Sequence, residues 1–417
     1  MMNNRQEIIN RIYYYGLLMI AITLPLPSFP LNSICIIAII IIWIVNVSME
    51  RKLMIDRQNV LLVSAPLALF VAYLIGVGYS SNIPDAWSSI QKKLPICFLP
   101  LVVASFPAIG SKRLNAILVS FVISCVCVSA ACVIYTFQLN KELGIEFASY
   151  NNWQFSDDNL IRKFGFHHVY FAMYLCLCLV VIGHLVNSSA NKYVKLGWIF
   201  ISIYIVLFMM ALSSRMGIIV LVVIATLAIL VYLRGSIVLK LLVITGLFVA
   251  TIVVGYQFPF IREKFTGLFD INLNQYNAKY RASSRWTLLN NSWSIIRDNW
   301  VFGVGTGDFD DLLLKEHMKS NYEEGIFHEY NAHNQYLDAA GCVGIMGFIA
   351  MLASMLIPFY LSLKKRDFLS LSFTLIVFLS FLTETMLARQ KGIVFFALFY
   401  SLLNMYGFHK ENRLLQF

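Results

Sequence analysis

Long apolar runs constrain the fold of this chain of 417 residues more than any other feature. A helix needs about 20 predominantly apolar residues to cross the hydrocarbon core of a bilayer. We identify about twelve candidate runs, at 11–28, 31–48, 60–80, 94–109, 115–138, 168–187, 196–213, 216–233, 240–257, 338–363, 368–387 and 393–408. The sequence therefore predicts an all-α polytopic membrane protein with about twelve transmembrane helices.

The composition agrees with this fold class. Hydrophobic residues make up 59% of the chain and charged residues 13%, whereas soluble domains carry about 45–50% and about 25%. These values exclude a water-soluble enzyme, a disordered chain and a nucleic-acid-binding domain. The formal net charge of +10 is therefore not taken as a sign of nucleic-acid binding. The positions of the basic residues relative to a membrane are considered instead, and no nucleic-acid partner is expected.

Basic residues in alternate short loops predict the orientation of the helices. Lysine and arginine accumulate on the cytoplasmic side of membrane proteins. The two termini and every second loop carry such residues, namely Arg5, Arg11, Arg51, Lys52, Arg57, Lys112, Arg113, Lys192, Lys195, Arg234, Lys240, Lys364, Lys365, Arg366, Lys410 and Arg413. These regions are predicted to be cytoplasmic. The two longest loops, at about 139–167 and 258–335, then face outward.

The later of these loops divides the chain into three parts. Residues 1–257 are predicted to form transmembrane helices 1–9, residues 258–337 the large outward loop, and residues 338–417 the last three helices and a cytoplasmic C-terminus. Within the loop, basic residues come first and acidic residues follow. Apolar residues recur at helical spacing over 285–296, which predicts an amphipathic helix near the membrane interface.

Three arginines are candidates for binding an anion. Arg215 lies in a tight turn between two apolar runs, where Ser213 or Ser214 can cap the following helix. A helix N-terminus beside a guanidinium suits phosphate, although an arginine that snorkels to the interface has the same pattern. Arg281 and Arg285 are four residues apart and share a helical face. They could hold a pyrophosphate, or form a basic face exposed to solvent or lipid headgroups.

Histidines supply the candidate bases. His333 precedes a long apolar run, where the N-terminus of a helix disfavours a charged imidazole, so it suits a general base. A capping or interfacial histidine is the alternative. His167 and His168 begin another span, and a packing role is the simpler interpretation for that pair.

Glycines form two further patterns. Gly303, Gly305 and Gly307 resemble a phosphate-cradling loop, but the strand–helix context that such a loop requires is absent. A tight turn that returns the chain to the membrane is the alternative. Gly344 and Gly347 follow His333 and favour close helix packing.

Missing features narrow the function further. No outer loop shows the constellation of aspartates and histidines that a metal-dependent transferase uses. Ion-coupled transporters usually keep charged residues near mid-bilayer, and the predicted spans are nearly bare of them. Arg215 and Glu384 are the exceptions, and both lie near the ends of spans.

The tract from Arg285 to Gly347 resembles the signature region of the O-antigen ligase / O-antigen polymerase superfamily. Residues 285–289 (RWTLL) match an Arg-x3-Leu motif, and His333-Asn334 followed by nine residues and 344–347 (GIMG) match a His-[Asn/Ser/Gln]-x9-Gly-x-x-Gly motif. Residues 300–309 resemble the family's Gly-x-Gly-x-Gly-x-Phe turn, without the proline common before the aromatic residue. Arg215 matches the family's arginine at the membrane edge.

This resemblance implies a membrane glycosyltransferase of GT-C-like fold in the bacterial inner membrane, with a metal-independent, inverting reaction on the periplasmic face. The donor would be a glycan on undecaprenyl pyrophosphate, whose polyprenyl chain a hydrophobic groove among the spans should hold, and membrane lipid is a further expected partner. The acceptor would be a sugar hydroxyl of lipid A–core in a ligase, or another lipid-linked glycan in a polymerase. Length and the histidine motif favour the ligase of lipopolysaccharide biosynthesis.

The resemblance also implies roles for particular residues. His333 would act as the base, and Arg215 and Arg285, with Arg281 as helper, would bind the pyrophosphate. His168 and Asn334 are auxiliary candidates. No metal and no cofactor are expected. A polymerase remains the close alternative, and a lipid-linked glycan flippase or other transporter the distant one.

Overall fold

The computed structural model describes residues 2–27, 29–50, 55–107, 109–144, 157–257 and 275–405. Over these residues the regular structure is helical throughout. The elements are α1 (Met2–Thr23), α2 (Phe29–Glu50), α3 (Arg57–Val77), α4 (Ile83–Ser105), α5 (Ser111–Leu143), α6 (Asp157–Ile161), η2 (Arg162–Phe164), α7 (His168–Ser188), α8 (Lys192–Ala211), α9 (Arg215–Tyr232), α10 (Ile237–Gln257), α12 (Gln275–Asp298), α13 (Phe309–Lys319), α14 (Glu323–Phe327), α15 (Gln335–Lys365), α16 (Phe368–Phe381), η3 (Met386–Ala388), α17 (Gln390–Phe399) and η4 (Tyr400–Met405).

The predicted all-α membrane class is confirmed at the level of helices. Within the described residues, eight helices are long and apolar enough to cross a membrane: α2, α3, α5, α7, α8, α9, α10 and α15. α16 is apolar but has only 14 residues, and α17 has 10. The count of twelve spans and the outward placement of 258–337 therefore stay predictions, and residues 258–274 lie outside the described residues.

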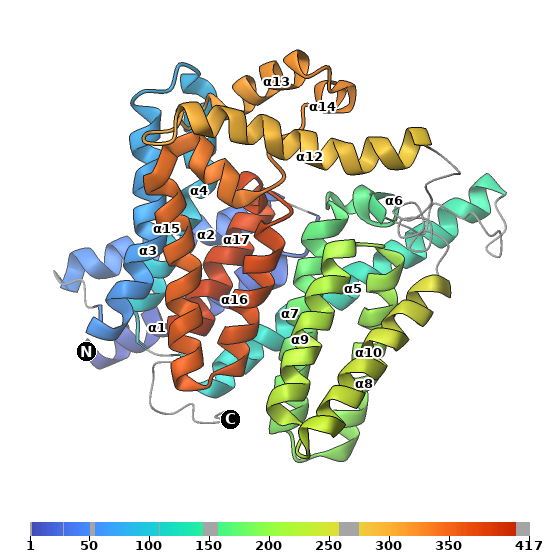
Figure 1. The fold of residues 1–417 in the computed structure, drawn as a ribbon. Coiled ribbons are helices and arrows are strands. Elements are labelled where there is room, and N and C mark those ends of the chain that lie inside the picture. The colour runs from blue at the N-terminus through green and yellow to red at the C-terminus, as the bar shows by residue number, and fades with distance from the viewer. Residues whose placement is uncertain are drawn as a thin grey trace.

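The helices form two groups that α12–α14 cover at one end (Figure 1). One group contains α1–α4 and α15–α17, and the other contains α7–α10. α5 and α7 join them: α5 packs against α1 and α7, and α7 packs against α16 and α17 as well as α8 and α9. We call the end that carries α12–α14 the outer end. The opposite end, with the connections at 189–191, 233–236 and 366–367, is called the basic end.

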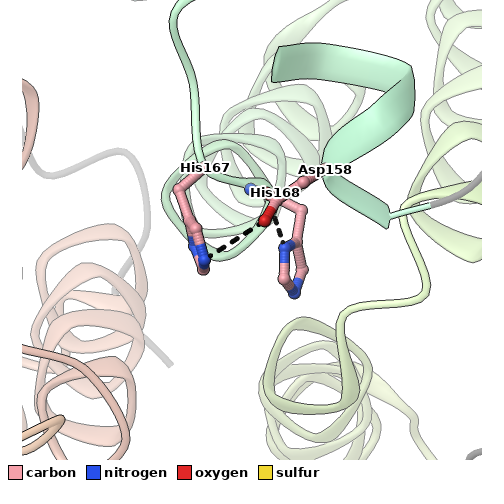
Figure 2. A group of neighbouring side chains, drawn as sticks. All are labelled: Asp158, His167 and His168. Carbon is pink, nitrogen blue, oxygen red and sulfur yellow. Dashed lines mark hydrogen bonds and ion pairs between the residues drawn. The ribbon is translucent and has the colours of Figure 1, made fainter. Parts of the chain in front are cut away.

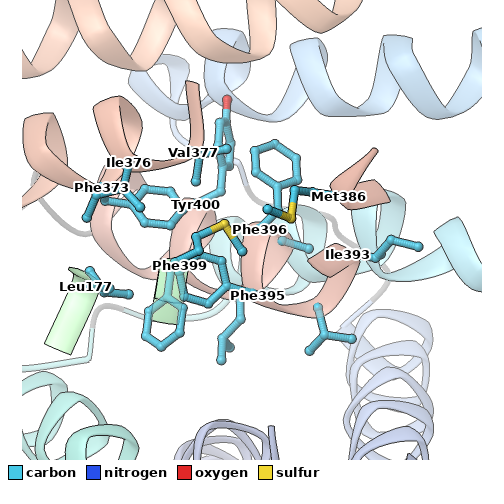
Figure 3. Close-up of a cluster of buried hydrophobic side chains, with 14 of the residues drawn as sticks. Leu177, Phe373, Ile376, Val377, Met386, Ile393, Phe395, Phe396, Phe399 and Tyr400 are labelled. Carbon is cyan, nitrogen blue, oxygen red and sulfur yellow. The ribbon is translucent and has the colours of Figure 1, made fainter. Parts of the chain in front are cut away.

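Aromatic side chains of α16, α17 and η4 pack together in a buried cluster that also contains Leu177 of α7 (Figure 3). The rings of Tyr174 and Phe395 stack with centroids 4.7 Å apart, and Phe121 meets Phe399 edge-on at 4.7 Å. Such pairs contribute about 0.5–1.5 kcal/mol beyond their burial. Since lipid tails are as apolar as these rings, close packing rather than exclusion of water holds them together inside a bilayer.

The predicted amphipathic helix is present as the second half of α12, which lies across the outer end (Figure 1). Leu288, Ser292 and Ile295 are buried, whereas Trp286 and Trp293 are 67% and 58% exposed. The buried residues recur every three or four positions, which is the pattern of a helix with one packed face. α12 thereby brings Arg285 over the ends of the other helices.

A kink in α15 explains the glycine at 344. Val343 and Gly344 leave helical geometry, and Gly344 takes a φ of 66°. The carbonyls of Gly341 and Cys342, which the kink releases from the helix, accept hydrogen bonds of 2.9 Å from the backbone N–H groups at positions 304 and 305. A Cβ on Gly344 would lie 2.3 Å from the carbonyl oxygen of Val301. Only glycine combines the positive φ with this close approach.

Gly344→Ala is expected to destabilise the protein by about 2–4 kcal/mol, because the substitution combines strain at positive φ with a backbone clash. Gly197→Ala is the matched control, since nothing lies within 4 Å of the Cβ it would add. Thermal unfolding midpoints of the two purified variants in one detergent measure the difference. Equal midpoints would show that the kink does not require glycine.

Candidate functional site

His333 lies just before α15 and faces a carboxylate from a distant part of the chain. Its Nδ1 is 3.0 Å from Oε1 of Glu384, which follows α16. His333 takes a φ of 44°, a conformation rare for non-glycine residues, and its backbone N–H donates to Oδ1 of Asn331 at 3.1 Å. The backbone turn thus directs the imidazole toward Glu384, a residue that is only 8% exposed.

The charge state of Glu384 determines which tautomer this pair favours. Burial alone would raise the pKa of Glu384, but the hydrogen bond with His333 and the charges of His333, His167 and Arg285 outweigh it and lower the pKa. The paired carboxylate is therefore present above its ordinary pKa and is lost only as the pH falls through the lowered value. Because a carboxylate can only accept, the Nδ1–H of His333 donates to Glu384, and in the neutral imidazole the lone pair is then on Nε2.

Arg285 contributes to the same site from α12. Its positive charge is one of the effects that lower the pKa of Glu384, and it is itself exposed. Arg281 lies one turn earlier in α12, and its side chain lies outside the described residues. The structure thus places one of the two predicted α12 guanidiniums in electrostatic range of the His333–Glu384 pair.

Asn334 has a structural role at this position. Its Oδ1 accepts hydrogen bonds from the N–H groups of Tyr336 and Leu337 at 2.9 and 3.1 Å, which caps α15. Its Nδ2 donates to the carbonyl of Leu382 at 3.0 Å. Asn334 therefore ties the start of α15 to the turn that carries Glu384, and its auxiliary role in the reaction stays a prediction.

Arg215 is the first residue of α9, as the sequence predicts, and Ser214 is the cap. The Ser214 Oγ accepts from the N–H of Gly217 at 3.3 Å. A Cβ on Gly217 would lie 2.7 Å from that of Ala172 in α7, so the first turns of α9 and α7 are in close contact. Arg215, the first residue of α9, therefore lies at the same end of this helix pair as His168, the first residue of α7. The meeting of Arg215 with His333 stays a prediction.

His167 and His168 share a carboxylate that sequence analysis missed (Figure 2). Oδ1 of Asp158 accepts from the backbone N–H of His168 at 2.8 Å and lies 2.9 Å from its Nδ1. Oδ2 lies 3.4 Å from Nε2 of His167. Burial would raise the pKa of Asp158, but the hydrogen bonds and charge of His168 lower it to about 2. Asp158 therefore caps α7 as a carboxylate and fixes both imidazoles.

This cluster corrects one expectation from the sequence. No outer loop was expected to contain an aspartate–histidine constellation, yet Asp158, His167 and His168 offer ligand atoms within 4.8 Å of one another and could hold a metal ion. The sequence hides the cluster because Asp158 is nine residues before His167 and ten before His168, and reaches them only through the α6–η2 turn. The charge of His167 also acts on Glu384, so the cluster borders the His333 pair.

The glycine-rich turn at 303–308 is not a phosphate cradle. Each of its six backbone N–H groups already donates within the protein, to Asn299, Gly341, Cys342, Gly76, Ser80 and Gly305 in chain order. An anion would find no free donor along this backbone. The alternative interpretation, a tight turn that returns the chain to the membrane, fits the contacts, since the turn packs on the α15 kink and on the end of α3.

Buried ionisable residues are also more numerous than expected. Asp338, inside the predicted span at 338–363, is 9% exposed, and its Oδ2 accepts from Tyr73 and Gln335, each at 2.9 Å. Lys93 is 5% exposed and lies 4.5 Å above the Tyr73 ring. Asp338 thus joins Arg215 and Glu384 as a charged residue near the end of a predicted span, and Lys93 lies just before the predicted span at 94–109. This network holds α3, α4 and α15 together beneath the site.

Comparison with known proteins identifies the region that contains these residues. Residues 200–352 match the family model described as O-Antigen ligase, so the resemblance seen in the sequence is confirmed there. This range includes Arg215, Arg285 and His333, whereas Glu384 lies beyond it. An uncharacterized protein from Haemophilus influenzae (strain ATCC 51907 / DSM 11121 / KW20 / Rd) is 23% identical over 134 residues, or 30% of this chain. The aligned part spans about a third (34%) of that curated relative.

Proposed function

We propose that this chain, whose residues 200–352 match the O-antigen ligase family, joins a lipid-linked O-antigen glycan to lipid A–core. The donor is the glycan on undecaprenyl pyrophosphate, and the acceptor is a sugar hydroxyl of the core. The site faces the periplasm from the bacterial inner membrane. The observation that carries the proposal is the hydrogen bond between His333 and Glu384. It orients a histidine of the matched region as a general base is oriented, and Arg285 lies in electrostatic range of the pair.

On the acceptor side, His333 acts as the general base. The acceptor hydroxyl attacks the anomeric carbon of the donor sugar while its proton passes to Nε2 of His333. Glu384 accepts the Nδ1–H hydrogen bond and stabilises the imidazolium that forms, as the third member of a catalytic triad does. A new glycosidic C–O bond forms on the face opposite the breaking bond, so the anomeric configuration inverts.

On the donor side, guanidiniums receive the leaving group. The bond between the anomeric carbon and the pyrophosphate oxygen breaks, and both electrons stay with undecaprenyl pyrophosphate. Arg285 and Arg215, with Arg281 as helper, bind those phosphates. The N-terminus of α9 at Arg215 adds its positive dipole end. Fixed donors aimed at developing charge stabilise the transition state, and no nucleotide is needed because the pyrophosphate linkage is already activated.

Analysis of lipopolysaccharide from a deletion strain, with and without a plasmid copy of the gene, tests the proposal. Loss of a ligase leaves bare lipid A–core while polymer accumulates on the carrier lipid. Core that carries a single repeat unit would instead indicate a polymerase. Loss of every lipid-linked glycan from the outer leaflet, with transfer activity intact in broken membranes, would indicate a flippase.

Arg215→Lys is expected to reduce transfer by about 10- to 100-fold, because lysine keeps the charge but cannot reproduce the planar fork that binds phosphate oxygens bidentately. Arg297→Lys is the matched control, since Arg297 is an exposed residue of α12 paired with Asp298. Transfer rates are measured with purified donor and acceptor in reconstituted vesicles. If the Arg215→Lys enzyme were as active as the control, bidentate binding of the phosphate by Arg215 would be contradicted.

A further inference from the structure

A cavity of about 760 Å³ opens between α7, α8, α9 and α16, away from the site at the outer end. Its lining reaches from Cys176 to Asn187 along α7 and from Leu221 to Arg234 along and just beyond α9. At 1.5 Å per helical residue these stretches are about 16 and about 20 Å long. Half of a bilayer's hydrocarbon core is about 15 Å. The cavity therefore runs along the helices for about the depth of one leaflet.

Polar and apolar groups are separated along this length. Most of the wall is aliphatic or aromatic, and it includes Leu179, Leu221 and Phe368. The polar lining residues gather at the basic end, where α7 and α9 finish and α8 begins: His184, Asn187, Lys195 and Arg234. Gly183 keeps the groove open, because nothing lies within 4 Å of the position a Cβ would take.

The charged end of the cavity lacks a matching anion from the protein. Among the described residues, neither Lys195 nor Arg234 forms an ion pair. Asp367 is the acid that acts on His184, but its Oδ1 accepts from the N–H groups of Leu369 and Ser370, which caps α16, and its Oδ2 accepts from the Ser370 hydroxyl. The buried Nδ1 of His184 has no hydrogen-bond partner among the described residues. Two cations therefore line the same opening as His184, whose buried Nδ1 is unsatisfied among the described residues.

We propose that this cavity binds an anionic phospholipid from the leaflet at the basic end. The phosphate lies between Lys195 and Arg234 with His184 in hydrogen-bonding reach, and one acyl chain follows the apolar wall toward Cys176. Basic pockets between transmembrane helices on the cytoplasmic side favour such headgroups. The polyprenyl donor fits less well, because its pyrophosphate belongs beside Arg215 and Arg285 at the opposite end of the bundle.

Such a lipid would join the two helix groups. α7, α8 and α9 supply one side of the cavity, and Phe368 and Leu369 of α16 supply the other. A ligand that binds only the folded protein stabilises it, by an amount that grows with the logarithm of the ligand concentration above the Kd. The inference does not depend on the proposed transfer reaction, so a failure of one leaves the other open to its own test.

Native mass spectrometry of the purified protein in detergent measures the binding. Three lipids are titrated separately: phosphatidylglycerol, phosphatidylcholine and undecaprenyl phosphate. We expect phosphatidylglycerol to bind tightest. Lys195→Ala and Arg234→Ala should each weaken its binding about 5-fold, and the double variant about 25-fold, since a basic residue near an anionic headgroup contributes about 1 kcal/mol.

A charge control and a groove variant complete the experiment. Lys364→Ala with Lys365→Ala removes two positive charges from the same end without touching the lining, and should change the affinity less than 2-fold. Gly183→Leu fills the groove and should abolish binding, while the unfolding midpoint in lipid-free detergent shows that the variant folds. Equal binding of phosphatidylcholine, equal losses in the charge control, or stronger binding of undecaprenyl phosphate with the same dependence on Lys195 and Arg234 would overturn the inference.

Discussion

His333→Ala is expected to lower the rate of glycan transfer by about 10²- to 10⁴-fold, the usual contribution of a positioned general base. Alanine removes the imidazole that takes the acceptor proton in the proposed site, while the turn held by Asn331 and Asn334 remains. Transfer from carrier-linked O-antigen to lipid A–core in reconstituted vesicles measures the effect.

The matched control for this variant is His328→Ala. His328 is five residues away and stacks on the Tyr330 ring at 5.3 Å, which in turn meets the His333 ring at 5.1 Å. The control therefore perturbs the same aromatic row without removing the base, and should keep activity within a few-fold of the wild type. Transfer by the His333→Ala protein at the control's rate would remove His333 from the mechanism.

Glu384→Gln is expected to lower the turnover number by about 10- to 10³-fold with little change in KM for the donor. Glutamine keeps the shape and can still accept a hydrogen bond. It no longer carries the negative charge that stabilises an imidazolium. Since Glu384 acts through His333, it is a positioning residue, and its loss should appear in turnover rather than in binding of the pyrophosphate.

Two further variants separate this role from simple packing. Glu324→Gln removes a carboxylate of α14 that accepts a hydrogen bond from the Tyr330 hydroxyl, and should leave turnover unchanged. Glu384→Asp keeps the charge at a shorter reach and should recover part of the lost rate. An unchanged turnover number for Glu384→Gln, or a loss confined to its thermal stability, would contradict the proposed pair.

The helices and their approximate limits followed from the sequence because each depends on local chemistry. Apolar runs of bilayer length have one stable form in lipid, since every backbone N–H and C=O must be satisfied within the segment. The same holds for the cap at Ser214 and the helical face of α12, where the deciding residues lie within one or two turns. The motif from Arg285 to Gly347 was also readable, because its residues are close in the chain.

The partners of those residues depended on contacts between distant segments. Glu384 is 51 residues from His333, and nothing in the local pattern distinguishes it from an acid at the end of a span. Asp158 reaches His168 only through an intervening turn, and Asp338 meets Tyr73 across 265 residues. The glycine turn at 303–308 looked suited to phosphate until its donors met α3 and the kinked α15.

The sequence by itself thus determined the class of the fold, the helices and the residues that could bear charge or accept a proton. Only the tertiary structure decided which of them meet, which glycines serve the backbone, and that His333 has a buried carboxylate behind it. The physical reason is that helix formation is settled by neighbours along the chain. The tautomer of an imidazole, by contrast, is settled by whichever group packing brings within hydrogen-bonding distance.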